Sequence, residues 1–170
     1  MIRRLPGDAL VVLIGPSGSG KSTFASRHFA ASAVLSSDAL RAMVADDPGD
    51  QAATDDAFAL LHAALEMRLR RGRLTVIDAT NVEAWARDRL LAVARRHRRA
   101  AAAIVFDLPL ATCLARNEAR SDRQVPAAAI RRQHARMRAS VQSLEAESFD
   151  PIVVLASPED VDALRLELEA

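Results

Sequence analysis

The sequence predicts an α/β fold in which helices cover both faces of a five-stranded parallel sheet. The evidence is a set of short apolar runs and the amphipathic segments that alternate with them. The runs are LVVLI (10–14), AVLSS (33–37), LTVID (74–78), AIVFDL (103–108) and IVVLA (152–156). Strands that are apolar on both faces are typical of a parallel sheet buried between helices. Their alternation with helical segments is the pattern of this fold class.

Length and composition fit a single domain over residues 1–170. No apolar run approaches the roughly 18 residues that would span a bilayer, so we expect no membrane contact. The first run is too short for a signal peptide and leads directly into a glycine-rich loop. The single cysteine, Cys113, fits a reducing compartment and therefore a cytoplasmic protein. The formal net charge of +1 does not by itself indicate a nucleic-acid partner.

Capping and turn residues mark the ends of several predicted helices. Thr54, followed by two aspartates, is typical of a helix start, and Gly72 after three arginines is typical of a helix end. Pro126 opens another helix, and the segment 157–160 opens the last one, which we expect to close the chain. Apolar or half-apolar residues repeat along these helices: Phe58, Leu61 and Leu65 in the first, and Ile130, His134, Met137, Val141 and Leu144 in the second.

Residues 15–22, GPSGSGKS, fit the pattern G-x-x-x-x-G-K-[ST] between a predicted strand and a predicted helix. The glycines let backbone N–H groups converge on phosphate oxygens at the positive end of the helix. Lys21 is the only lysine beside 22 arginines. Its compact ammonium can reach the β- and γ-phosphates, where a planar guanidinium would fit poorly.

This motif predicts binding of ATP or another nucleoside triphosphate together with Mg²⁺. The hydroxyl of Ser22 can ligate the metal. The residues expected to hold the nucleotide phosphates are Gly15, Ser17, Gly18, Ser19, Gly20, Lys21, Ser22 and Thr23.

Two carboxylates follow the next predicted strands and would lie beside the loop, because ligands of open α/β sheets bind at the carboxyl ends of the strands. Asp38, in SSDALR, could take a proton from an attacking hydroxyl; it could equally cap the following helix. Arg41 lies three residues on and could hold an acceptor phosphate. Asp78, in IDATN, could hold a magnesium water or could be a buried turn residue.

The segment 116–126, RNEARSDRQVP, predicts a lid over the triphosphate. Arg116, Arg120 and Arg123 recur at helical spacing, so a helix would present all three on one side. Such arginines can spread the charge of a transferring phosphoryl group. Spacing alone favours the alternative, a solvated face in an arginine-rich protein.

Four motifs in this order resemble the kinase domain of the bacterial polynucleotide kinase-phosphatases of RNA repair: GPSGSGKSTF, SSDALR, VIDATNV and ARNEARSDRQV. The similarity runs from about residue 8 to about residue 168. The loop motif is shared with many NTPases, whereas the other three together are more specific. Looser forms occur in the phage polynucleotide kinase and the zeta-toxin sugar kinases.

The resemblance implies transfer of the γ-phosphate of an NTP, with Mg²⁺, to the 5′-hydroxyl of a broken RNA or DNA strand. It makes Asp38 the general base, Arg41 a contact to the acceptor strand and Asp78 part of the metal and acceptor site. It places Arg116, Arg120 and Arg123 in the lid, with Lys21 and Ser22 in their loop roles.

Repair enzymes of this family continue into a phosphatase and a ligase-like adenylyltransferase. We expect this chain to be a stand-alone kinase or one domain of such an enzyme, with those repair domains as partners in cis or in trans. Two alternatives stay open. A small-molecule kinase would use the same Lys21, Asp38 and lid around an enclosed acceptor pocket. A nucleotide-binding module without transfer chemistry would need neither Asp38 nor the lid arginines.

Overall fold

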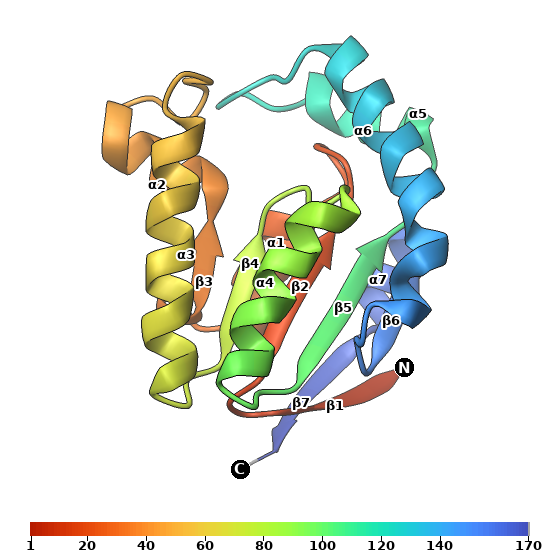
Figure 1. Ribbon diagram of the computed structural model, residues 1–170. Coiled ribbons are helices and arrows are strands. Elements are labelled where there is room, and N and C mark those ends of the chain that lie inside the picture. The colour runs from red at the N-terminus through yellow and green to blue at the C-terminus, as the bar shows by residue number, and fades with distance from the viewer. Residues whose placement is uncertain (170) are drawn as a thin grey trace.

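The computed structural model describes residues 1–169 and confirms the predicted architecture. A five-stranded, fully parallel sheet has the order β3-β4-β2-β5-β6, and helices cover both of its faces (Figure 1). Its strands are β2 (Leu10–Ile14), β3 (Val34–Ser36), β4 (Thr75–Asp78), β5 (Ala101–Phe106) and β6 (Ile152–Leu155).

The helices that cover the sheet follow the strands in alternation. They are α1 (Lys21–His28), α2 (Ser37–Ala45), α3 (Thr54–Arg70), α4 (Ala84–Arg96), α5 (Leu110–Glu118), α6 (Ala127–Ser140) and α7 (Pro158–Ala163). Two 3₁₀ turns, η1 (Ala31–Ala33) and η2 (Val141–Ala146), complete the connections. No helix within residues 1–169 is both long and apolar enough to cross a membrane.

The central strand β2 separates two apolar cores, because successive side chains of a strand point to opposite faces. Leu10, Val12 and Ile14 pack on one face with apolar residues of α3 and α4. Val11 and Leu13 pack on the other face with residues of α1 and α5. All five β2 side chains are fully buried. This burial fixes the position in the sheet at which β2 ends and the following loop begins.

The helix boundaries largely follow the predicted signals. α3 begins at Thr54 and is followed by Gly72 in a left-handed conformation, and Pro126 directly precedes α6. The stripe through Val141 and Leu144 continues beyond α6, but as a 3₁₀ turn rather than an α-helix. The predicted strand 33–37 is shorter than expected, because η1 precedes it and Ser36 already caps α2.

The prediction for the chain ends was wrong. Ser157 and Asp160 form a capping box at the start of α7, as expected, but the helix stops at Ala163. Residues Arg165–Glu169 form β7, which pairs in parallel with β1 (Ile2–Pro6) in a separate two-stranded sheet. Leu5 of β1 is buried and joins the α1 core, so this pair ties both ends of the described chain to the body of the domain (Figure 1).

Candidate active site

The phosphate-binding loop joins the carboxyl end of β2 to the first turn of α1. Gly18 and Gly20 have φ angles of 80° and 96°, a backbone region that favours glycine. A Cβ atom at Gly18 would also lie 2.2 Å from the carbonyl oxygen of Cys113. Gly20 caps α1, so the loop ends at the positive end of that helix. The local geometry is therefore that of an anion-binding loop.

Lys21 is folded back onto this loop. Its ammonium donates hydrogen bonds to the carbonyl oxygens of Gly15 and Pro16, each at 2.9 Å, and the residue is only 7% exposed. Burial lowers the pKa of Lys21, and the negative charge of Asp78 opposes that shift. The ammonium thus lies at the base of the loop, close to a carboxylate that helps to keep it charged.

Asp78 ends β4 beside Lys21 and Ser22. Burial raises the pKa of Asp78, while Lys21 and the Ser22 hydroxyl oppose the rise. No group of three or more His, Cys, Asp or Glu residues within 1–169 could form an all-protein metal cage. Mg²⁺ needs no such cage, because it usually keeps several waters and takes one or two protein ligands plus substrate phosphates. The Ser22 hydroxyl and the Asp78 carboxylate fit that requirement.

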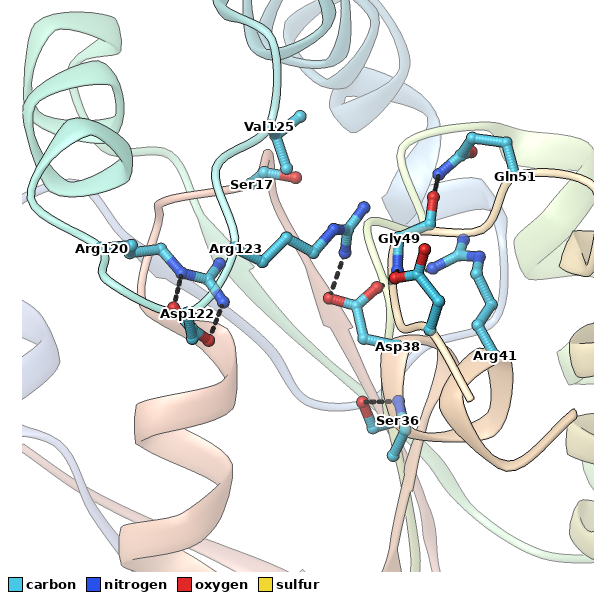
Figure 2. A network of polar contacts seen from close by, with 12 residues as sticks. Ser17, Ser36, Asp38, Arg41, Gly49, Gln51, Arg120, Asp122, Arg123 and Val125 are labelled. Carbon is cyan, nitrogen blue, oxygen red and sulfur yellow. Dashed lines mark hydrogen bonds and ion pairs between the residues drawn. The ribbon is translucent and has the colours of Figure 1, made fainter. Parts of the chain in front are cut away.

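Asp38 is not the cap of α2. The Ser36 hydroxyl accepts the hydrogen bond from the backbone N–H of Ala39 at 3.3 Å and takes that role. Asp38 instead lies between two guanidinium groups, and each of its oxygens is 2.6 Å from one of them: Oδ1 from Arg41 and Oδ2 from Arg123 (Figure 2). Its side chain remains 42% exposed. The helix-cap alternative is therefore excluded, and both carboxylate oxygens are paired with arginines instead.

Arg41 is held between α2 and α3. Besides its ion pair with Asp38, its Nε donates to the Thr54 hydroxyl at 3.2 Å, and its side chain is 11% exposed. Arg41 does not line the cavity in front of the loop. Its contact with an acceptor phosphate stays a prediction.

The three arginines do not share one helix, although their spacing allows it: Arg116 lies on α5, and Arg120 and Arg123 follow it in a loop. α5 ends at Glu118, and residues 119–126 form a loop that crosses from α5 toward α2 (Figure 1). The buried side-chain amide of Asn117 holds this loop in place. Its Oδ1 accepts a hydrogen bond from the backbone N–H of Val125, and its Nδ2 donates one to the carbonyl oxygen of Val125, both at 2.8 Å. A closed bridge of this kind is incompatible with continued helix. No local sequence pattern predicts it.

The three arginines nevertheless gather around the loop and Asp38. Arg116, on α5, donates to the backbone carbonyl of Ser19 at 3.3 Å. Arg120 forms a two-pronged contact with Asp122, which lowers the pKa of that carboxyl. Arg123 pairs with Asp38 and does not line the cavity (Figure 2). The lid therefore contacts both sides of the site, whereas the sequence placed all three arginines on the nucleotide.

A cavity of about 770 Å³ lies in front of the loop. Most of the predicted residues line this cavity, but two residues of the loop do not. The backbone N–H of Gly15 donates a hydrogen bond to the carbonyl oxygen of Thr80, and Ser19 is fully buried. The predicted residues that line the cavity are Ser17, Gly18, Gly20, Lys21, Ser22, Thr23, Asp38, Asp78, Arg116 and Arg120.

Sequence reasoning missed the far end of this cavity. Pro158, Val161 and Asp162 of α7 line it, together with Arg27 of α1, which forms an ion pair with Asp162 at 3.0 Å. It also missed Gln133 of α6, whose side-chain oxygen accepts a hydrogen bond from the backbone N–H of Ser17 at 2.9 Å. One sequence signal could have indicated this contribution of α7. The helix follows the last strand, and parallel strands end at a common edge of the sheet, where the phosphate-binding loop also lies.

Residues 10–144, which contain the loop, both carboxylates and the lid, match the family described as an AAA domain. The chain belongs to the AAA domain family. No match to this AAA domain is found among curated proteins.

Solved structures share the fold of this AAA domain. A chain in the structure of the Pnkp1/Rnl/Hen1 RNA repair complex is 22% identical, with a TM-score of 0.69, and the match covers 83% of this chain and 47% of that one. A gluconokinase from Sinorhizobium meliloti 1021 is 20% identical, with a TM-score of 0.58 and coverages of 94% and 87%. The Mycobacterium tuberculosis APS kinase CysC is 21% identical, with a TM-score of 0.55 and coverages of 91% and 90%.

These likenesses show that the AAA domain has a P-loop kinase fold. The RNA repair protein is about twice as long as the part that matches, since the AAA domain spans 47% of it. The two small-molecule kinases are matched over nearly their whole length. The fold is therefore shared by a chain of an RNA repair complex and by two small-molecule kinases, and it does not by itself define an acceptor for this AAA domain.

Proposed function

We propose that this AAA domain is a 5′-hydroxyl polynucleotide kinase, which transfers the γ-phosphate of ATP or another NTP to the 5′-hydroxyl of an RNA or DNA strand. The observation that carries the proposal is the position of Asp38. This carboxylate lines the same cavity as Lys21 and is flanked by two arginines. A carboxylate can accept a hydrogen bond from a hydroxyl, and paired guanidinium groups can bind a phosphate. A 5′-terminal nucleotide with a 3′-phosphate carries both a hydroxyl and a phosphate.

On the donor side, the loop amides and Lys21 hold the β- and γ-phosphates. Ser22 and Asp78 would hold Mg²⁺, which neutralises charge on the phosphates during transfer. Arg116 lies over the loop on the rigid end of α5 and can follow the charge that develops there. Arg120 already lines the same cavity and would bind a phosphate oxygen in exchange for Asp122.

On the acceptor side, Asp38 orients the 5′-hydroxyl and takes its proton as the new bond to phosphorus forms. Arg41 and Arg123 would hold the phosphate on the 3′ side of the terminal nucleoside. To do so, each guanidinium exchanges a carboxylate oxygen of Asp38 for a phosphate oxygen. This exchange also frees the carboxylate to accept the hydroxyl, so acceptor binding and base activation are coupled. We therefore propose Arg123 for the acceptor side, because its ion pair is with Asp38.

A small-molecule kinase is the second candidate, and one observation favours it. Five aspartates lie between the end of α2 and the first turn of α3, next to the acceptor site: Asp46, Asp47, Asp50, Asp55 and Asp56. Negative charge there disfavours a long polyanion that crosses this segment. The polynucleotide reading therefore requires the strand to leave the site in another direction.

The deciding experiment is phosphorylation with γ-labelled ATP of four acceptors: a 5′-hydroxyl oligonucleotide, a 3′-phosphorylated nucleoside, a plain nucleoside and a sugar. We expect labelling of the first two and little of the others. Asp38→Asn should lower kcat by about 100- to 10,000-fold, because it removes the base, while ATP binding and the fold remain.

The outcomes separate the candidates. Labelling of the sugar alone would establish the small-molecule kinase. ATP binding without any transfer would indicate a nucleotide-binding module. Normal turnover by Asp38→Asn would remove the assigned base. We further propose a cytoplasmic role in nucleic-acid repair, with phosphatase or ligase domains as partners, since the repair complex contains a chain of the same fold.

A further inference from the structure

Arg87 is a buried cation that the proposed reaction leaves without a role. It lies on α4, its side chain is fully buried, and it does not line the cavity. Its Nε and Nη2 donate hydrogen bonds to the two carboxylate oxygens of Glu147, both at 2.7 Å. Glu147 directly follows η2, so this two-pronged contact joins α4 to the segment after α6. Arginine is almost never fully buried unless it is paired, so the two residues form one unit.

The remaining nitrogen of Arg87 binds the turn 79–82, which follows β4. Its Nη1 donates a hydrogen bond to the backbone carbonyl oxygen of Asn81 at 2.9 Å. Asn81 has a φ angle of 49°, in the left-handed region that few residues adopt. The hydroxyl of Ser140, at the end of α6, donates to the carbonyl oxygen of Val82 and accepts from Arg87 Nη1 at 3.2 Å. Two successive carbonyls of the turn are therefore held by side chains that do not line the cavity.

The same turn is bonded to the start of the phosphate-binding loop. The side-chain nitrogen of Asn81 donates to the carbonyl oxygen of Leu13, near the end of β2, at 2.7 Å. The backbone N–H of Gly15 donates to the carbonyl oxygen of Thr80 at 2.9 Å. The turn also begins directly after Asp78, the last residue of β4. Its position therefore sets the position of the Asp78 carboxylate relative to the loop.

Stability alone does not explain the buried ion pair. The free-energy cost of moving two charges out of water often exceeds their attraction, and apolar residues of similar volume can stabilise a fold as well or better. Burial by itself would raise the pKa of Glu147, but hydrogen bonds from Arg87 and Ser143 lower it below its usual value, so the carboxylate stays charged. What apolar side chains cannot supply is a hydrogen-bond donor at the Asn81 carbonyl.

We propose that Arg87 is a positioning residue, which holds the turn 79–82 and thereby places the Asp78 carboxylate beside the phosphate-binding loop for Mg²⁺ and the nucleotide phosphates. This inference rests on the proposed phosphoryl transfer, but it is independent of the acceptor. Arg87 itself touches neither substrate, and Glu147 keeps its guanidinium in place. Hydrogen-bonding partners behind a metal ligand typically contribute about 10- to 100-fold to metal affinity or activity.

Hydrogen exchange of the enzyme without ligands tests the position of the turn directly. The double variant Arg87→Met/Glu147→Leu replaces the ion pair by apolar side chains of similar volume, so the fold should be retained. The Asn81 carbonyl loses its donor, and the turn should loosen. The amide of Gly15, which bonds this turn, should then exchange about 10-fold faster by NMR, as expected for a weakened buried hydrogen bond. The amide of Val12, in the middle of β2, should exchange as in wild type.

Magnesium dependence gives the second test. The double variant should need about 10- to 100-fold more Mg²⁺ for half-maximal activity and should bind Mg²⁺ with ATP correspondingly more weakly in calorimetry, while the KM for the acceptor stays unchanged. Arg95→Ala, which removes an exposed ion pair with Asp88 on the same helix, should behave as wild type. Leu65→Ala creates a cavity under α3 and should lower the unfolding temperature without changing the Mg²⁺ requirement.

The kinase and the positioning role can fail separately. If wild type labels no acceptor, the proposed function is wrong, whereas the exchange of Gly15 and the affinity for Mg²⁺ with ATP still test the position of the turn. If the double variant keeps wild-type exchange at Gly15 and a wild-type Mg²⁺ requirement, Arg87 does not position the turn. An equal rise of the Mg²⁺ requirement in Leu65→Ala would attribute the effect to stability and would also contradict the positioning role.

Discussion

At the residue scale, Lys21 shows why this arginine-rich chain keeps a lysine. Its ammonium fits between two backbone carbonyl oxygens at 2.9 Å in a nearly closed space. A guanidinium is planar and larger, and it cannot occupy the same point. We expect Lys21→Arg to lower kcat by at least about 100-fold, the usual loss for a misplaced electrostatic donor, although the charge is kept. Steady-state kinetics with the oligonucleotide acceptor measures this.

The control for this prediction is a conservative change at an exposed cation. Arg70 lies at the end of α3 and does not line the cavity, so Arg70→Lys should leave kcat unchanged. Turnover by Lys21→Arg within a few-fold of wild type would show that charge alone suffices at this position. Unfolding curves of both variants test whether a loss of kcat comes from a lower stability of the fold.

Single residues differed in how well the sequence predicted them. The loop residues were identified because the motif is contiguous and its strand and helix are unmistakable. Asp38 was ambiguous because Ser36 and Asp38 are both good caps, and only the observed bond from Ala39 decides between them. Arg123 was assigned to the nucleotide from the resemblance of its motif to that of the polynucleotide kinases. Its contact with Asp38 depends on a loop that no local pattern encodes.

At the scale of elements, the lid depends on Asn117. This side chain is 5% exposed and closes residues 118–124 into a loop through its two bonds to Val125. Asn117→Ala leaves a buried backbone N–H and carbonyl without partners, which costs about 1–3 kcal/mol per group. We expect the lid to open, kcat to fall and proteolysis within 119–126 to become faster. Limited proteolysis and steady-state kinetics measure both effects.

Ser121→Ala is the matched control for the lid, since Ser121 is an exposed residue of the same loop. It should leave proteolysis and kcat unchanged. If Asn117→Ala retains wild-type kcat and wild-type protease resistance, the two bonds to Val125 do not hold the lid.

Elements were predictable where burial dominates. The central strands β4, β2 and β5 are apolar runs because they are buried between helices, and the edge strands β3 and β6 are partly apolar although they are only partly buried. β1 and β7 were missed because IRRLP and RLELE carry charges on an exposed face and have few apolar residues. Their pairing joins segments from opposite ends of the chain, which local periodicity does not report.

At the scale of the whole molecule, the net charge of +1 conceals an uneven distribution. Five aspartates lie between the end of α2 and the first turn of α3, whereas Arg116, Arg120 and Arg123 lie around the phosphate-binding loop and Asp38. A molecule of nearly zero net charge provides little long-range attraction for a polyanion. The affinity for an acceptor strand should therefore come from a few local contacts.

This small number of contacts predicts a shallow salt dependence. Each phosphate that a single strand places on a cation contributes a slope of about −0.7 to log K against log salt. If Arg41 and Arg123 share one acceptor phosphate, the slope for an oligonucleotide should be about −0.7. Replacing both arginines by alanine should flatten the slope, whereas Arg70→Ala, at the end of α3, should not change it. Filter-binding titrations over a range of salt concentrations measure this slope. A slope several times steeper would mean that many more arginines meet the strand.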